Sequence, residues 1–295
     1  PAAGDDGIAI GCAYYGWLEI LKQRRSFVME HAYVGRRYSD AEVAAALQGA
    51  AVSFVGAVGS DAYAEPAMKY LRASGVDVAH VDVTDEVTGL AVITVDQAGE
   101  NTIIVVPGAN ALVDDSFVSS HSSPIEIADL LLLQGEIPAE GFARAVALAR
   151  GRVVVNLAPV VEVDKCALLR ADPLLANEHE AGLILEQLGL RSDGSPEELA
   201  QRLREAGFAS VVLTLGARGA LVAEGSSLVA VPSPQVTPVD TTGAGDGFAG
   251  ALCARLLEGD ALVEAAAYAA RVGAFAVTGA GAQASYPDAT DKLPS

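Results

Sequence analysis

The chain has 295 residues, of which 51% are hydrophobic and 19% charged, a globular composition with material for one large domain or two medium ones. Its formal net charge of −19 argues against a nucleic-acid or anionic-membrane partner, since both need basic surfaces. Three widely spaced cysteines, no signal-peptide pattern and no apolar run of roughly 20 residues lead us to expect a cytoplasmic protein.

From residue 41 onward, short apolar runs alternate with helical patterns. The apolar runs predict buried strands at 52–59, 129–135, 152–159, 172–178 and 210–216. The segments between them predict helices at 41–49, 64–74, 140–150, 179–188 and 196–206. The alternation predicts an α/β fold with a doubly wound, mostly parallel sheet flanked by helices, and ligands at the carboxyl ends of the strands.

Residues 88–110 break this alternation, because two strand patterns are joined by a short turn that contains glycine. This predicts a β-hairpin. One interpretation makes it an antiparallel extension at the edge of the main sheet, and the other makes it a small sheet that closes over the active site as a lid. The pattern leaves both open. Helical patterns follow from Asp246 to Gly259 and from about 261 to 277.

The sequence DTTGAGDG, residues 240–247, places glycines directly before a predicted helix. It is neither a GxxxxGK[ST] loop nor GxGxxG. The N–H groups of Gly243, Ala244, Gly245 and Asp246 at a helix N-terminus predict an anion hole for a transferring phosphoryl group. With an ordinary pKa of about 3.9, Asp246 is ionised at neutral pH and is a candidate general base for an alcohol. The alternative is that Asp246 only caps the helix.

The string DTTGAGDGFAGAL resembles the C-terminal signature of the ribokinase-like (PfkB) sugar and nucleoside kinases. The elements ANEHEA (176–181), LTLGARGALV (213–222) and the stretch 54–78 resemble the same family, and the similarity covers roughly residues 41–290. The resemblance implies ATP-dependent phosphorylation of the primary hydroxyl of a sugar, in the first place D-ribose to ribose 5-phosphate.

The resemblance also implies one ribokinase-like α/β domain over 1–295, with a small β-sheet lid inserted from about 12–40 and 88–108. Because lid sheets have open edges, we expect a homodimer formed through the lid.

By the same resemblance, Asp246 deprotonates the sugar hydroxyl beside the backbone of Gly243, Ala244 and Gly245. The implied sugar-binding residues are Glu136, Gly35, Arg37, Asp40 and Asp246. The implied ATP-binding and Mg²⁺-organising residues are Asn177, Glu180, Thr214, Gly216, Gly219 and Gly245. The implied monovalent cation (K⁺) site comprises Asp240, Thr242, Ala276, Gly279, Gly281 and Ser285.

Residues 1–40 depart from the family. At the sugar-binding positions the aligned residues are Gly16, Gly35–Arg36, Arg37 and Asp40, in place of an aspartate, a diglycine, a lysine and an asparagine. Three explanations remain open: another sugar or nucleoside as substrate, a weakened sugar- or nucleotide-binding paralogue, or an N-terminal sequence that differs from the natural gene product. The intact GAGD favours a kinase, and Gly16 and Asp40 favour an altered substrate or a non-catalytic binding protein.

Overall fold

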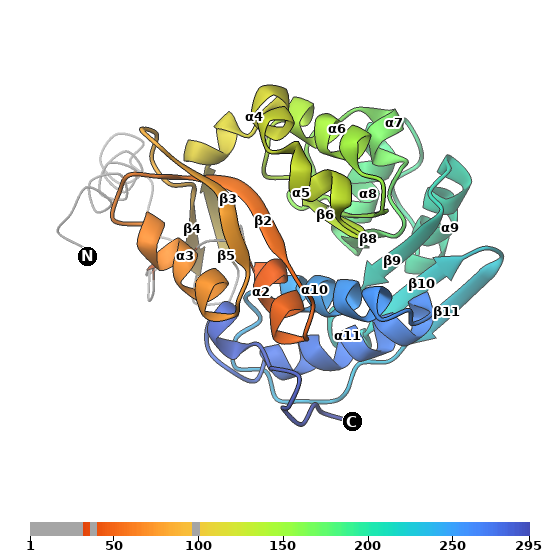
Figure 1. Ribbon diagram of the computed structural model, residues 1–295. Coiled ribbons are helices and arrows are strands. Elements are labelled where there is room, and N and C mark those ends of the chain that lie inside the picture. Colours follow the sequence, from red (N-terminus) through yellow and green to blue (C-terminus); the bar gives the residue numbers. More distant parts are fainter. Residues whose placement is uncertain (1–31, 36–39, 96–100) are drawn as a thin grey trace, which may run out of the picture. The chain divides into compact units, whose positions relative to one another are not determined.

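The computed structural model describes residues 32–35, 40–95 and 101–295 (Figure 1). These residues belong to two compact units. The smaller unit contains the strand at 32–35 and the described part of 90–105, and the larger unit contains the other described residues. Residues 12–31 and 36–39 of the predicted lid lie outside the described residues. No helix of the described chain combines the length and the apolar character needed to cross a membrane.

The larger unit is built on a six-stranded sheet with the order β11-β10-β9-β8-β7-β6. Its strands are β6 Leu130–Gln134, β7 Arg152–Asn156, β8 Leu174–Asn177, β9 Ser210–Thr214, β10 Ala220–Glu224 and β11 Ser227–Val231. Strands β6 to β9 are parallel, and β10 and β11 are antiparallel to their neighbours. The parallel register pairs Gln134 with Asn156 and Asn177 with Thr214, so polar residues gather at the carboxyl edge of the sheet.

Helices cover both faces of this sheet (Figure 1). One face carries α6 Ala139–Leu148, α7 Lys165–Leu168, α8 Glu178–Gln187 and α9 Pro196–Ala206, and the other carries α10 Ala244–Leu257 and α11 Leu262–Ala276. Along β7, Val153 and Val155 pack into the core between the sheet and α6 to α9. Val154 packs into the core between the sheet and helices α10 and α11. This two-sided burial explains why the parallel strands are continuous apolar runs rather than alternating ones.

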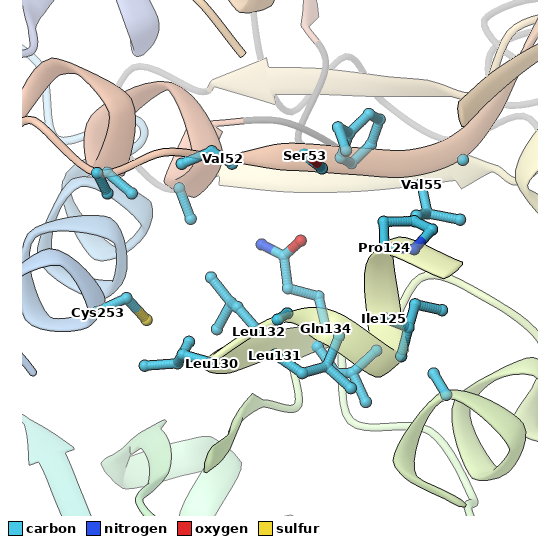
Figure 2. Close-up of a pocket in the computed structure, with 18 of the residues that line it drawn as sticks. Val52, Ser53, Val55, Pro124, Ile125, Leu130, Leu131, Leu132, Gln134 and Cys253 are labelled. Atoms are coloured by element: carbon cyan, nitrogen blue, oxygen red, sulfur yellow. The ribbon is translucent and has the colours of Figure 1, made fainter. Parts of the chain in front are cut away.

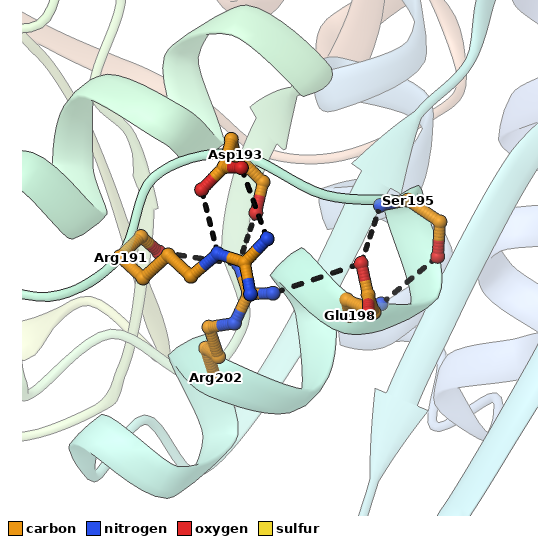
Figure 3. Close-up of polar contacts among 5 residues, drawn as sticks. All are labelled: Arg191, Asp193, Ser195, Glu198 and Arg202. Atoms are coloured by element: carbon orange, nitrogen blue, oxygen red, sulfur yellow. Dashed lines mark hydrogen bonds and ion pairs between the residues drawn. The ribbon is translucent and has the colours of Figure 1, made fainter.

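Helix α9 illustrates how local sequence sets an element's boundaries. Ser195 and Glu198 form a reciprocal capping box, Pro196 occupies the first turn, and Gly207 ends the helix with a φ of 118°. The preceding loop is held by side chains that converge in Figure 3, where Arg191 pairs with Asp193 and Arg202 lies between that loop and Glu198. The side-chain hydrogen bonds from Arg191 lower the pKa of the exposed Asp193 carboxyl to about 2.

The larger unit contains a second, two-stranded parallel sheet of β2 Ser53–Gly59 and β3 Asp77–Thr84. The remaining helices are α2 Asp40–Leu47, α3 Ala64–Ala73, α4 Asp115–Ser120 and α5 Ser122–Ile127, with 3-10 helices η2 Gly108–Leu112, η3 Gly216–Arg218 and η4 Gln283–Ser285. Helix α2 packs closely on α10 at Gly250. A Cβ added to Gly250 would lie 2.2 Å from the Ala41 carbonyl oxygen, so the close approach requires glycine there.

The smaller unit is a three-stranded sheet with the order β1-β4-β5. Its strands are β1 Ala32–Gly35, β4 Leu90–Val95 and β5 Asn101–Val106, and β1 is antiparallel to β4. The hairpin therefore belongs to a separate sheet, so the interpretation of residues 88–110 as an edge extension of the main sheet is wrong. The covering of the active site by this sheet stays a prediction.

Candidate active site

The start of α10 is shaped by the glycine that precedes it. Gly243 is the N-cap and adopts a φ of 74°, and a Cβ there would lie 2.5 Å from both the Ala282 Cβ and the Tyr286 hydroxyl. The Tyr286 hydroxyl donates to the Gly243 carbonyl at 2.9 Å, which fastens the loop to the segment after α11. Only glycine combines this left-handed conformation with so close an approach.

The first turn of α10 offers backbone donors to an anion. Its N-cap makes no side-chain capping hydrogen bond, and a Cβ built on Gly245 would meet nothing within 4 Å. The Ala244 N–H donates weakly to the Thr241 carbonyl at 3.3 Å, while the next N–H groups of a helix have no intrahelical acceptor. An anion can therefore approach this turn closely and be stabilised by the helix dipole.

Asp246 is the third residue of α10, so it is not the N-cap residue. Its Oδ1 accepts a hydrogen bond of 3.3 Å from the Nε2 of Gln134, the last residue of β6. This contact ties the helix start to the carboxyl edge of the sheet. Gln134 was missed from sequence, although an amide ending a run of four leucines was the available signal.

Glu136 follows Gln134 after one glycine. A Cβ at Gly135 would lie 1.8 Å from the Pro159 carbonyl oxygen, so only glycine lets the chain turn there. One carboxylate oxygen of Glu136 is buried, and the side chain borders the same cavity as Gln134. Glu136, the predicted sugar-binding residue, thus lies two residues after Gln134, which donates a hydrogen bond to Asp246.

Asn177 and Glu180 lie where β8 passes into α8, and they form a capping box. The Asn177 Oδ1 accepts from the Glu180 N–H at 2.9 Å, and the Glu180 Oε2 accepts from the Asn177 N–H at 2.8 Å. From the sequence, only a role in binding phosphate and Mg²⁺ was expected for this pair. The box uses one oxygen of each side chain and holds both residues at the carboxyl edge of the sheet.

Thr214 pairs in register with Asn177 at the end of β9, next to a tight turn. In this turn the Leu215 N–H donates to the Gly219 carbonyl at 2.8 Å, and Gly216 and Gly219 have φ values of 58° and 91°. A Cβ at Gly219 would strike the Val231 carbonyl at 2.0 Å, whereas one at Gly216 would meet nothing within 4 Å. Gly216 therefore presents open backbone beside Thr214 and Asn177.

Asp240 joins two loops behind the start of α10. Its Oδ1 accepts from the Thr242 N–H and its Oδ2 from the Gly281 N–H, both at 2.9 Å. Burial by itself would raise the pKa of Asp240, but the hydrogen bonds from Thr242 and from the Gly281 N–H outweigh it and lower the pKa below its ordinary value. The carboxylate is therefore ionised at neutral pH and holds the loops together.

The remaining residues of the predicted cation site, Ala276, Gly279 and Ser285, lie at the end of α11 and in the segment that follows it. Ala276 ends α11 and accepts the Gly279 N–H at 3.2 Å, and the Ser285 hydroxyl lies 2.8 Å from the Gly281 carbonyl. Within the described residues no three His, Cys, Asp or Glu side chains converge as metal ligands. The monovalent cation site stays a prediction.

The predicted sugar-binding residues near the N-terminus are only partly described. Gly35 ends β1 and pairs with Ala91, and Asp40 begins α2. Arg37 and Gly16 lie outside the described residues. The structure thus brings together the glycine loop, Asp246, Gln134 and the segment after α11, and it leaves the grouping of Gly35, Arg37 and Asp40 as a prediction.

Comparison with known proteins gives a consistent picture. A match to the pfkB family of carbohydrate kinases covers residues 41–289. The ribokinase of Haemophilus influenzae is 33% identical over 266 residues, which are 89% of this chain and 86% of that protein. The deoxyribokinase of Salmonella typhimurium is 29% identical over 86% of this chain and 84% of that protein.

Solved structures agree with the sequence comparisons. A ribokinase from Thermotoga maritima has a TM-score of 0.78 and 30% identity, covering 85% of this chain and 83% of that one. A ribokinase from Arabidopsis thaliana, complexed with ribose and ATP, has a TM-score of 0.75 and 27% identity, covering 85% of this chain and 83% of that one. These likenesses confirm the predicted α/β fold, and the family match begins where the predicted resemblance begins, at residue 41.

Proposed function

Because the chain belongs to the pfkB family of carbohydrate kinases, as a kinase of the ribokinase type, we propose that it phosphorylates the primary hydroxyl of D-ribose with ATP. The observation that carries the proposal is Asp246, held by Gln134 at the edge of the sheet beside the open first turn of α10. The relative from Arabidopsis thaliana that binds ribose and ATP supports the choice of substrates.

In this proposal the carboxylate of Asp246 takes the proton of the sugar hydroxyl, which then attacks the γ-phosphorus in line with the leaving ADP oxygen. The hydrogen bond from Gln134 orients Asp246 toward the alcohol. The N–H groups of Gly245 and Asp246 donate to the transferring phosphoryl oxygens, where charge develops. Glu136 accepts hydrogen bonds from sugar hydroxyls.

The nucleotide lies along the carboxyl edge of the sheet, over the open backbone of Gly216 and beside Thr214 and Asn177. Mg²⁺ bound to ATP would neutralise the phosphate oxygens, and Asn177 and Glu180 supply oxygen donors of the kind Mg²⁺ prefers. The loops joined by Asp240 would hold K⁺ through their carbonyl oxygens and keep the peptide dipoles of the glycine loop oriented.

Turnover of ATP by purified protein tests this function. We expect ADP release with ribose, Mg²⁺ and K⁺, and a loss of about 10²–10⁴-fold in kcat in Asp246→Asn, because the general base is removed. Asp115→Asn is the matched control, since Asp115 also lies in the first turn of a helix and is exposed. If the ribose-dependent kcat of Asp246→Asn stays within tenfold of that of the unmutated chain, the role of Asp246 as general base is refuted.

A second candidate is the same chemistry on another sugar. The altered residues Gly16, Arg37 and Asp40, together with the similar deoxyribokinase, favour testing 2-deoxyribose, fructose and nucleosides beside ribose. A higher kcat/KM for one of these would reassign the substrate and leave the roles at α10 intact. Binding of sugar or ATP without any turnover would instead favour a non-catalytic binding protein.

We also propose that the protein is a homodimer joined through the sheet of β1, β4 and β5. Among the described residues, β1 and β5 each pair with β4 only, and this supports the proposal because an unpaired strand edge accepts a partner strand. The molar mass measured by light scattering tests it, and a single species of one chain across micromolar concentrations would contradict it.

A further inference from the structure

The first turn of α10 is held by side chains from two different parts of the fold. From the sheet, the Gln134 side chain projects into a cavity of about 680 Å³ between β6 and β2 (Figure 2), and its amide donates to the Asp246 carboxylate. From the segment after α11, the Tyr286 hydroxyl donates to the Gly243 carbonyl oxygen at 2.9 Å. Gln134 thus contacts the candidate base, whereas Tyr286 contacts the backbone of the candidate anion hole.

The Gly243 carbonyl and the Ala244 N–H belong to one peptide unit, which is trans. In a planar trans peptide the C=O and N–H bonds point in opposite directions, so the direction of one sets the direction of the other. The Gly243 carbonyl accepts the Gly247 N–H at 2.8 Å and the Tyr286 hydroxyl. Both lone pairs of this oxygen are therefore used, and the Ala244 N–H is directed away from the helix.

The hydrogen bond from Tyr286 also polarises this peptide unit. A carbonyl that accepts a hydrogen bond makes the N–H of the same peptide a stronger donor, and hydrogen bonds are strengthened where water is excluded. Tyr286 is 8% exposed, so its hydroxyl acts from a buried position. Its donation therefore strengthens the Ala244 N–H as a donor to an anion.

The next peptide unit of the turn is constrained by packing. The Ala244 carbonyl oxygen lies against α11, where a Cβ added to Gly273 would be 3.4 Å from it. The carbonyls of Gly243 and Ala244 thus both face the protein. The N–H groups of Ala244 and Gly245, which belong to the same two peptide units, face the opposite way, where an anion approaches.

The ring and the hydroxyl of Tyr286 have different contacts. The ring packs in a core cluster that includes Val58 and Ala276, and it lies so close to α10 that a Cβ at Gly247 would be 3.2 Å from its Cε1. A phenylalanine ring would fill the same space. Only the hydroxyl reaches the Gly243 carbonyl, so Tyr286→Phe separates packing from the contact with the anion-hole peptide.

Tyr286 is a rigid donor because the residues on both sides of it are fixed. The Ser285 hydroxyl lies 2.8 Å from the Gly281 carbonyl oxygen. The Pro287 carbonyl accepts from the Nε2 of the buried Gln48 at 2.7 Å. Such supporting contacts matter for catalysis, because a displacement of about 1 Å at a reacting centre can lower a rate by about 10²-fold.

We propose that Tyr286 is a positioning residue for phosphoryl transfer, and this inference rests on the proposed kinase function. Its hydroxyl orients and polarises the peptide unit whose Ala244 N–H donates to the transferring phosphoryl group. Charge develops on the phosphoryl oxygens in the transition state, so a donor that is turned away or weakened lowers kcat.

Steady-state kinetics of Tyr286→Phe test this role. We expect kcat to fall by about tenfold or more and the KM for ribose to stay within about twofold, because the sugar does not contact this peptide. Ser74→Ala is the matched control, since it also removes a hydroxyl that donates to a backbone carbonyl at a helix end, that of Tyr70 at 2.7 Å, and its kcat should not change. A kcat of Tyr286→Phe within about twofold of that of the unmutated chain would overturn the inference and leave the kinase function in place.

Binding of inorganic phosphate, followed by NMR through the amide resonances of Gly245 and Asp246, gives a readout that does not depend on turnover. The dissociation constant of phosphate should rise at least about fivefold in Tyr286→Phe and stay unchanged in Ser74→Ala. Equal phosphate affinity in Tyr286→Phe and the unmutated chain, or no phosphate-dependent shift at these amides, would overturn the inference. If the expected phosphate affinities are found but no sugar is turned over, the proposed function alone is refuted.

Discussion

Thr88 belongs to the larger unit and lies two residues before Leu90, where the second segment of the smaller unit begins. Its side chain is 2% exposed, and its hydroxyl donates to the Asp61 Oδ1 at 2.7 Å and accepts the Gly59 N–H at 3.0 Å. Thr88→Val keeps the shape of the side chain and removes both hydrogen bonds. The variant therefore isolates the contribution of the hydroxyl group.

The expected loss of stability follows from the two groups, the Gly59 N–H and the Asp61 carboxylate, that lose a hydrogen bond to the Thr88 hydroxyl. A buried N–H without an acceptor costs about 1–3 kcal/mol, and a hydrogen bond to a charged group contributes about 1.5–3 kcal/mol. Asp61 still accepts the backbone N–H groups of Tyr63, Ala64 and residue 88, so the second loss lies at the low end. We expect Thr88→Val to lower the free energy of unfolding by about 2–4 kcal/mol.

Urea unfolding followed by circular dichroism measures this effect. With a slope of about 3 kcal/mol/M, the midpoint should fall by about 1 M with the slope unchanged. Thr88→Ser keeps the hydroxyl and loses one methyl group, so it should cost only about 1 kcal/mol. If the midpoints of Thr88→Val and Thr88→Ser agree within about 0.2 M, the reasoning about the hydroxyl is refuted.

Three further variants test the site. Gln134→Leu removes the hydrogen bond to Asp246 and frees this side chain to rotate, so it should lower kcat more than it raises KM for the sugar. The control is Gln201→Leu, at an exposed position of α9. An unchanged kcat in Gln134→Leu would contradict this prediction. Gly243→Ala should cost about 1–3 kcal/mol of stability from its positive φ and also lower kcat, and wild-type values of both would refute it. Asp240→Asn tests the contribution of the Asp240 carboxylate to the stability of the fold. The pKa of Asp240 is lower in the folded than in the unfolded chain. The ionised carboxylate therefore stabilises the fold above the unfolded pKa of about 3.9, and this stabilisation disappears as pH falls through the folded pKa. The melting temperature of Asp240→Asn should therefore lie below that of the unmutated chain at pH 7 and converge with it in acid; a gap that persists at acid pH would contradict the reasoning.

The elements that local signals mark were predicted well. Helix α9 has the predicted bounds because Ser195, Pro196 and Gly207 define its ends through backbone hydrogen bonds and φ angles alone. The parallel strands were found because burial on two faces produces uninterrupted apolar runs. The strand β3 was not predicted, since its polar and apolar residues are mixed, as at an exposed sheet edge.

Pairing between strands was harder to predict than the strands themselves. Strand β10 is antiparallel to β9 and to β11, and neither β10 nor β11 was predicted as a strand from the sequence. The hairpin at 88–110 was predicted, but its pairing with β1 depends on a strand more than 50 residues earlier. Periodicity describes which face of a strand is buried and contains no information on which strand lies beside it.

The sequence by itself determined the glycine loop, the helix that follows it and the position of Asp246 in its first turn, because backbone conformation and helix polarity depend on neighbouring residues. Only the tertiary structure decided that Gln134, 112 residues away, holds Asp246, and that Asp240 reaches Gly281 across 41 residues. These contacts depend on strand order and on the packing of α10 and α11 against the sheet. Such packing is set by the summed burial of many side chains, which no single motif records.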